Sequence, residues 1–206
     1  MKRRESIKML TLSAGCIIAT PTLMQLLSSC KTEKGEKWAP KFLSTKDLFV
    51  VSLLSDLILP TSKTMGALDV QTPQFIDTIL HEVISKKEQN KFRKGASIFN
   101  KTFKKIYKKE ISEGKKEDFL TLLNTYFKIS AKKQAAIFDL LESDSPPLEN
   151  QDTYFIYSYL LFVRHYTLFG YYTSEEVGTQ ILTYDPSPGF YNGCVPVEEA
   201  GNIPSA

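Results

Sequence analysis

The segment Asp152-Thr-Tyr-Phe-Ile-Tyr-Ser-Tyr-Leu-Leu-Phe-Val-Arg-His-Tyr-Thr-Leu-Phe-Gly-Tyr-Tyr172 decides the fold of this chain. Apolar and aromatic residues occur on every side of a helix drawn through it, interrupted only by Arg164 and His165. A helix that is apolar all round is normally buried, so we predict a central helix over residues 152–172. Replacing Phe162 or Phe169 with Ala is then expected to cost about 3–5 kcal/mol, the range for a buried aromatic side chain.

Further helices are predicted on both sides of this segment, because apolar residues recur there at helical spacing. The first begins after Ser44, with Asp47 as the capping-box acid, and ends before Pro60. The next begins at Thr72 and Pro73, with the threonine as cap and the proline in the first turn. Four more are expected, over residues 88–110, 116–127, 131–141 and 174–182. The sequence therefore predicts a single all-α domain of six or seven helices.

The helix predicted over residues 88–110 is rich in lysine. Residues 86–116 hold twelve basic and three acidic residues, whereas residues 117–206 hold four basic and twelve acidic ones. The side chains expected to face inward are Phe92, Ile98 or Phe99, Phe103, Ile106 and Tyr107. The lysines form either a solvated face balanced by acidic surface elsewhere, or a basic face toward anionic lipid or an acidic partner.

Two segments break the helical pattern. Residues 143–150 contain Pro146-Pro147, and the periodicity stops again after Leu182. From Tyr184 to Pro196 the chain is rich in proline and aromatic residues. This composition predicts an irregular C-terminal tail, ordered by lying on the protein's own surface or on a partner's.

The N-terminus resembles an export signal. Arg3 and Arg4 are followed by Ile7-Lys8 and a moderately apolar stretch, as in a twin-arginine signal, and Leu27-Ser28-Ser29-Cys30 resembles a lipobox. Polar residues interrupt the apolar stretch, which favours a signal over the alternative of an uncleaved anchor helix. We expect export by the twin-arginine route, lipid attachment at Cys30, and a location on the periplasmic side of a membrane.

These features divide the chain into a twin-arginine and lipoprotein-type signal segment, a polar tether and a helical domain, over residues 1–29, 30–43 and 44–206. The whole chain has 26 Lys and Arg against 23 Asp and Glu, and residues 30–206 hold 22 of each kind. The formal charge of +3 therefore belongs to the signal. Overall charge gives no support to nucleic-acid binding, and we expect no nucleic-acid partner.

The cysteines are few. Cys16 lies in the signal and Cys30 is the expected lipid site, which leaves Cys194 alone in the mature chain. No intrachain disulfide is then expected. Burial as a small apolar residue is the default for Cys194, and a disulfide to a partner or close packing against one is the alternative.

Motifs that carry chemistry are missing from the sequence. It has no Gly-x-Gly-x-x-Gly, no Cys-x-x-Cys-His, no spaced cysteine set and no Gly-x-Ser-x-Gly. His81 and His165 are far apart and lack the spacing of paired metal ligands. Asp69 and Asp77 are interpreted as capping residues rather than as an acid pair. We therefore predict no catalytic, cofactor-binding or metal-binding residue in this chain.

Two groups of residues, one near each end of the helical domain, resemble a known family. The first is Ile58-Leu59-Pro60-Thr61-Ser62-Lys63-Thr64-Met65-Gly66-Ala67-Leu68-Asp69-Val70, followed by Pro73, Phe75-Ile76 and Asp77. The second is Gly170-Tyr171-Tyr172-Thr173-Ser174-Glu175, Thr179-Gln180, Tyr184, Pro188-Gly189 and Tyr191-Asn192-Gly193-Cys194-Val195-Pro196. Both are similar to the signature of the gluconate 2-dehydrogenase subunit 3 family, over roughly residues 45–197.

The resemblance implies a role. Family members are small subunits of membrane-associated, flavin-dependent sugar and sugar-acid dehydrogenases. Their large subunit is a flavoprotein of the glucose–methanol–choline type, and a multihaem cytochrome c often accepts the electrons. The implied function here is a non-catalytic export and assembly companion, with FAD in the partner subunit. The candidate partner-contact residues are Pro60, Gly66, Asp69, Tyr171, Tyr172, Tyr191 and Cys194. The alternative is that the loop over residues 59–69 and the segment over residues 170–196 simply cover the domain's own core.

Two further hypotheses compete with this one. A stand-alone envelope lipoprotein that binds a sugar or a cell-envelope component would have a pocket lined by Tyr and Trp. An enzyme in its own right would need Arg164, His165 and an acid gathered in one cleft.

Overall fold

The computed structural model describes four parts of the chain, which are residues 38–143, residues 147–182, Cys194 and Pro196. Residues 40–206 form one compact unit and residues 1–39 form another. Of the second unit only Trp38 and Ala39 are described, and both are exposed. The predictions for Arg3, Arg4, Cys30 and Tyr191 lie outside the described residues.

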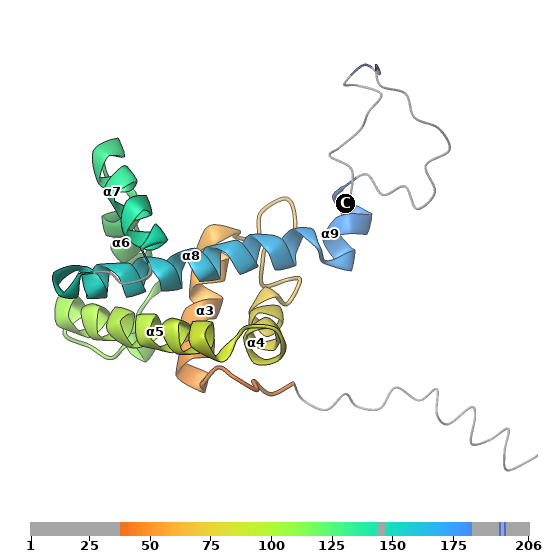
Figure 1. The fold of residues 1–206 in the computed structure, drawn as a ribbon. Helices are drawn as coiled ribbons and strands as arrows, with labels where there is room; N and C mark the ends of the chain where they lie inside the picture. The colour runs from red at the N-terminus through yellow and green to blue at the C-terminus, as the bar shows by residue number, and fades with distance from the viewer. Residues whose placement is uncertain (1–37, 144–146, 183–193, 195, 197–206) are drawn as a thin grey trace, which may run out of the picture. The chain divides into compact units, whose positions relative to one another are not determined.

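Seven α-helices and two short 3-10 helices make up the described part of the chain, in which no strand occurs. They are α3 (Thr45–Ile58), α4 (Thr72–Glu82), α5 (Lys86–Tyr107), η1 (Ile111–Glu113), α6 (Lys116–Phe127), α7 (Ala131–Glu142), η2 (Leu148–Asn150), α8 (Gln151–Tyr172) and α9 (Glu175–Gln180) (Figure 1). The prediction of an all-α fold with six or seven helices is confirmed.

Serine side chains cap the N-termini of several helices. Ser44 accepts a hydrogen bond from the Asp47 N–H at 3.1 Å, and Ser85 and Ser174 cap α5 and α9 in the same way. Each serine satisfies one of the N–H groups that a first helical turn leaves without a partner. The prediction for Thr72 is wrong. Gln71, in the left-handed conformation with φ of 54°, occupies the cap position, and Thr72 is the first helical residue.

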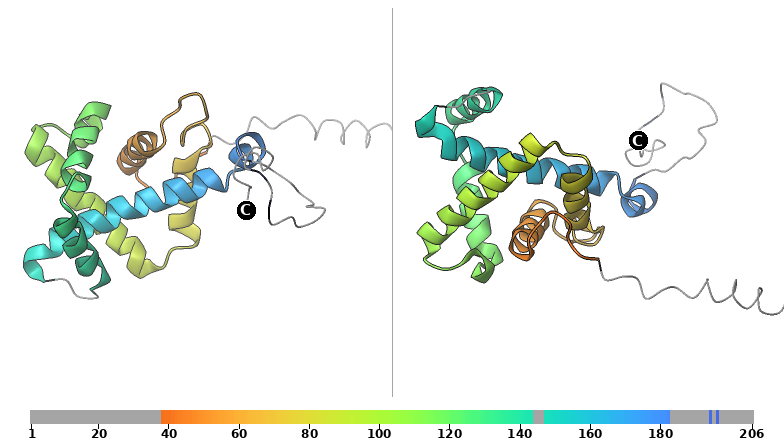
Figure 2. Two further views of the ribbon diagram at one scale, coloured as in Figure 1. Left: turned by 90° about the horizontal axis from the view of Figure 1, so that it is seen from above. Right: turned by 60° about the horizontal axis from the view of Figure 1, so that its bottom comes forward.

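Helix α8 is the centre of the compact unit, as the sequence predicts. It packs against α3, α4, α5 and α7, with α6 and α7 near its N-terminal end and α4 near its C-terminal end (Figures 1 and 2). Its fully buried Tyr159 and Val163 join Val51, Phe99 and other buried residues in one hydrophobic core. Burying this much aromatic and aliphatic surface is the main stabilising contribution to the fold.

Helices α5 and α8 approach each other closely at Gly95. A Cβ atom added at this position would lie 2.6 Å from the Cβ of Tyr159 and would also meet the carbonyl oxygen of Phe155. Any side chain larger than a hydrogen atom would push the two helices apart. The glycine in the middle of α5 is therefore explained by packing, which outweighs its low helix propensity.

The expectation of burial on every side is wrong for the last turns of α8. Phe169 is 49% exposed and Tyr172 is 53% exposed. In the described part of the chain, no helix other than α4 covers the side of α8 on which these two residues lie. Phe162 is half-buried and packs against the core, with its ring 5.2 Å from that of Phe92. On α5, Ile106 is exposed rather than inward.

Asp77 does not cap a helix, which corrects the sequence interpretation. It lies within α4, is 1% exposed, and its carboxylate accepts hydrogen bonds from three consecutive backbone N–H groups. These come from Lys41 at 2.8 Å, Phe42 at 3.0 Å and Leu43 at 2.7 Å. Asp77 thus fixes the chain that leads into α3 against α4.

Among the described helices, none has the length and apolar character that crossing a membrane requires.

Candidate functional site

The loop between α3 and α4 folds back on itself through Asp69. One oxygen of this carboxylate accepts hydrogen bonds from the Gly66 N–H and from the Thr61 hydroxyl, both at 2.7 Å. The Ala67 N–H also donates to the Leu59 carbonyl at 2.9 Å. Gly66 is buried and packed so closely that an added Cβ would collide with the backbone of residues 59–61. The loop therefore has a defined shape that depends on its own sequence.

The end of α8 holds this loop in place. The Tyr171 hydroxyl donates to the Met65 carbonyl at 2.8 Å. Around this bond, Val70, Tyr171 and Val177 form a second buried cluster, and Leu59, Met65, Ile181 and Leu182 pack against it. We call this arrangement the junction, comprising residues 59–70 and 170–182. The first group of residues that carries the sequence resemblance is thus brought together with the described part of the second.

The candidate contact residues in the junction fall into two groups. Gly66 and Tyr171 are buried, so they shape the junction rather than present a side chain to a partner. Pro60, Asp69 and Tyr172 are exposed. Contact between these exposed residues and a partner stays a prediction.

Cys194 is exposed, so the default expectation that it is a buried apolar residue is wrong. It follows α9 in the sequence, and Tyr191, between the two, lies outside the described residues.

Beside the junction, α8 presents an exposed aromatic strip that the sequence did not single out. His165, Phe169 and Tyr172 lie on one side of the helix, and the rings of His165 and Phe169 stack with centroids 6.2 Å apart. The Phe169 ring also rests on Phe75 of α4, at 6.0 Å. The strip is aromatic, partly held in place by ring contacts, and open to solvent, and exposed aromatic side chains of this kind are enriched in contact surfaces for other proteins.

Hydrogen bonding and burial shift two pKa values in the junction. Donation from the Gly66 N–H, and then from the Thr61 hydroxyl, holds the pKa of Asp69 below its usual value. Burial raises the pKa of Tyr171 above its usual value. Asp69 is therefore a carboxylate, and Tyr171 a neutral phenol, throughout the neutral range.

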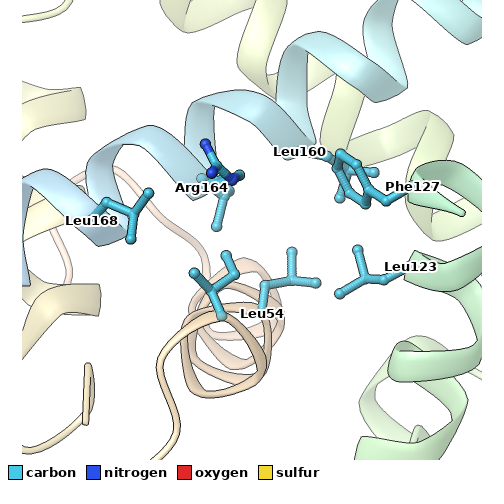
Figure 3. A pocket seen from close by; sticks show the side chains of 8 residues that line it. Leu54, Leu123, Phe127, Leu160, Arg164 and Leu168 are labelled. Atoms are coloured by element: carbon cyan, nitrogen blue, oxygen red, sulfur yellow. The ribbon is translucent and has the colours of Figure 1, made fainter. Parts of the chain in front are cut away.

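An apolar pocket of about 420 Å³ lies between α3, α6 and α8. Figure 3 shows Arg164 of α8 among Leu54, Leu123, Phe127, Leu160 and Leu168. Of the described residues that line it, Arg164 alone is charged. A single guanidinium group does not form an acid–base pair.

The cluster that an enzyme would need is not formed by Arg164 and His165. These neighbours point to different sides of α8, since His165 lines another pocket, with Glu88 and Lys91 of α5. No group of three or more His, Cys, Asp or Glu residues suited to a metal ion occurs in the described part of the chain.

A more polar pocket of about 650 Å³ lies between α6, α7, η2 and the start of α8. Tyr126 and Tyr157 line it together with Asp139 and Asn150. The Tyr157 hydroxyl already donates to the Tyr126 carbonyl at 2.7 Å, so that hydroxyl is committed to the fold.

Comparison with known families gives one match. The family described as gluconate 2-dehydrogenase subunit 3 matches residues 46–189 of the 206. The chain belongs to the gluconate 2-dehydrogenase subunit 3 family. Neither a curated protein nor a solved structure matches the chain significantly.

Membership of the gluconate 2-dehydrogenase subunit 3 family makes this chain a small subunit of a gluconate 2-dehydrogenase-like complex, associated with a dehydrogenase large subunit. The matched range includes the loop, α8 and α9, and hence the whole junction. The family assignment predicted from the two groups of residues is confirmed.

Proposed function

We propose that this chain is the non-catalytic small subunit and the export and assembly companion of a flavin-dependent sugar or sugar-acid dehydrogenase. The observation that carries the proposal is the junction. A family-matched loop and a family-matched helix end, far apart in sequence, form one defined structure with an exposed aromatic strip beside it. A structure of this kind suits binding of another subunit.

In this proposal the redox chemistry belongs to the large subunit, a flavoprotein of the glucose–methanol–choline type that binds FAD. Holding the pyrophosphate of FAD requires several cationic or N–H donors. Among its described lining residues, the apolar pocket beside α8 offers only the cation of Arg164, so these residues do not fit the cofactor. A multihaem cytochrome c would accept the electrons.

The large subunit would dock on the exposed aromatic strip and the exposed part of the loop. Phe169 and Tyr172 offer exposed aromatic area, and the exposed part of the loop, which includes Pro60, has a shape fixed by Asp69. Aromatic side chains that are already held in place contribute strongly to interfaces, because little conformational entropy is lost on binding.

The proposal extends to location. Arg3 and Arg4 would direct the folded complex through the twin-arginine route, and a lipid at Cys30 would anchor it to the periplasmic side of a membrane. A lipoprotein cysteine carries several acyl chains, which hold a protein far more firmly than one chain does.

The export role is tested by changing the signal of this chain alone. In cells that express both subunits, the double variant Arg3→Lys and Arg4→Lys should leave both this chain and the flavoprotein in the cytoplasm. The control variant Lys8→Arg keeps the arginine pair and should export both. Normal export of the flavoprotein while the double variant is retained would show that this chain is not its export companion.

The stand-alone lipoprotein is the second candidate, favoured by the pocket that Tyr126 and Tyr157 line with polar neighbours. It predicts that the chain purified without any partner binds a sugar at this pocket. Loss of sugar binding in Asn150→Ala would support it, and an isolated chain that binds no sugar would contradict it.

A further inference from the structure

The outer face of α5 carries a row of exposed lysines. Lys87, Lys94 and Lys101 recur every seven residues, and Lys105 and Lys108 continue the same face. The buried side of the helix holds Phe92, Phe99 and Phe103, so these five lysines lie on the side directed away from the core. We call them the lysine stripe.

The described part of the protein places no acidic partner on the lysine stripe. Other lysines nearby form ion pairs, such as Lys91 with Glu88, Lys104 with Glu110 and Lys109 with Asp118. None of the five stripe lysines forms an ion pair with a residue that the structure describes. Lys94 instead lies 4.0 Å from the centre of the Phe155 ring, a cation–π contact that supplies no negative charge.

The chain that leads in from the N-terminus reaches the compact unit next to α5. The Phe42 ring packs on Phe92 of α5, and the Arg93 guanidinium lies 4.4 Å over it. A shallow surface pocket contains both Phe42 and Lys101 of the stripe. Asp77 holds this part of the chain in place through its bonds to residues 41–43.

Chain length limits how far this face can lie from a lipid at Cys30. At most about 3.5 Å per residue, the ten steps from Cys30 to Pro40 span no more than about 35 Å. The point where the chain joins the domain therefore lies within about 35 Å of the bilayer that holds the anchor, and Lys101 of the stripe lines the same pocket as Phe42 beside that point.

We propose that the lysine stripe binds the anionic phospholipid surface of that bilayer and orients the domain on it. Uncompensated lysines in a row suit a plane of phosphate-bearing headgroups, and they attract it over about a Debye length. The inference rests on the proposed function for the lipid anchor that brings the stripe to the membrane. It leaves the aromatic strip beside the junction free for the large subunit.

Vesicle binding tests the proposal on the full chain. The triple variant carries Lys87→Gln, Lys101→Gln and Lys105→Gln. Each lost lysine should lower the affinity for phosphatidylglycerol-containing vesicles about fivefold, so the triple variant should bind about 100-fold more weakly. The control variant Lys128→Gln, Lys132→Gln and Lys133→Gln removes the same charge around α7 and should bind like the original chain. Neither variant should change binding to pure phosphatidylcholine vesicles. Equal binding of both variants to anionic vesicles would overturn the proposal.

Lysine acetylation of the bound chain gives an independent measurement, because it reports the accessibility of each lysine separately. Vesicle affinity, in contrast, also includes any binding by the N-terminal segment. On anionic vesicles, Lys87, Lys101 and Lys105 should be protected from the reagent while Lys132 and Lys133 stay reactive. Equal reactivity of the two groups would overturn the proposal. Loss of a co-purifying flavoprotein in the stripe variant, with vesicle binding unchanged, would assign the stripe to the protein partner and also overturn it. No flavoprotein enters the vesicle assay, so the two proposals fail separately.

Discussion

The Tyr171 hydroxyl donates a hydrogen bond to the Met65 carbonyl at 2.8 Å and joins segments 106 residues apart. Tyr171→Phe keeps the ring and removes the donor, leaving a partly buried carbonyl without this partner. We expect a loss of about 1 kcal/mol in the free energy of unfolding, measured by urea denaturation. Tyr172→Phe, at an exposed neighbour, is the control and should have almost no effect. Equal stability of the two variants would show that the bond does not hold the junction.

The pKa shift of Asp69 predicts how the stability of the loop depends on pH. Hydrogen bonds from Gly66 and Thr61 lower this pKa in the folded state below the ordinary value of 3.8. The stabilisation is therefore complete above about pH 4, the unfolded value, and is lost as the pH falls through the folded value. Asp69→Asn should be less stable than the original chain at neutral pH, and the difference should shrink in acid. The control Asp139→Asn, on the exposed face of α7, should give no such difference. A destabilisation by Asp69→Asn that is constant with pH would contradict this explanation.

The contact of α5 and α8 at Gly95 predicts opposite effects for two glycine substitutions. Gly95→Ala adds a methyl group where Tyr159 and the Phe155 backbone already lie, and should cost about 1–3 kcal/mol through overpacking. Gly178→Ala adds the same group in α9 with nothing within 4 Å. It should stabilise the protein by up to about 1 kcal/mol, since alanine favours a helix. Thermal unfolding of both variants measures this, and a neutral Gly95→Ala would show that the helices are not in contact there.

The exposed aromatic strip predicts a separation of binding from stability. Phe169→Ala together with Tyr172→Ala should reduce the amount of flavoprotein that co-purifies, while costing less than about 1 kcal/mol each in stability. Phe162→Ala is the matched control, since this half-buried ring packs on Phe92 and Tyr166. It should lower stability by about 2–3 kcal/mol and leave the flavoprotein bound to the folded chain. Unchanged co-purification in the double variant would remove the strip from the interface.

The helices could be predicted because each depends on local sequence. Apolar spacing, serine caps and Pro60 are read directly from the chain, and α6 begins and ends at the predicted residues. The exposure of Phe169 could not be predicted, because it depends on how far the neighbouring helices extend along α8 toward its C-terminal end. Composition shows that a helix is apolar, and only packing shows which side is covered.

The role of Asp77 had a signal that the sequence interpretation did not use. It lies on the same side of α4 as Ile76 and Leu80, both fully buried, and a buried carboxylate requires hydrogen-bond donors. Its donors belong to residues 41–43, some 35 positions earlier, so their identity could come only from the structure. The junction could likewise be predicted only in part. The sequence indicated both segments as candidate contact regions, but only the structure shows that Tyr171 bonds to Met65.

The central claim is tested most directly by purifying the tagged full chain from native membranes in a gentle detergent. Flavin absorbance and mass spectrometry of the purified material then identify what accompanies the chain. We expect an equimolar flavoprotein of the glucose–methanol–choline type, with its flavin bound. A chain that comes out of the membrane alone and colourless would overturn the subunit role and favour the stand-alone lipoprotein.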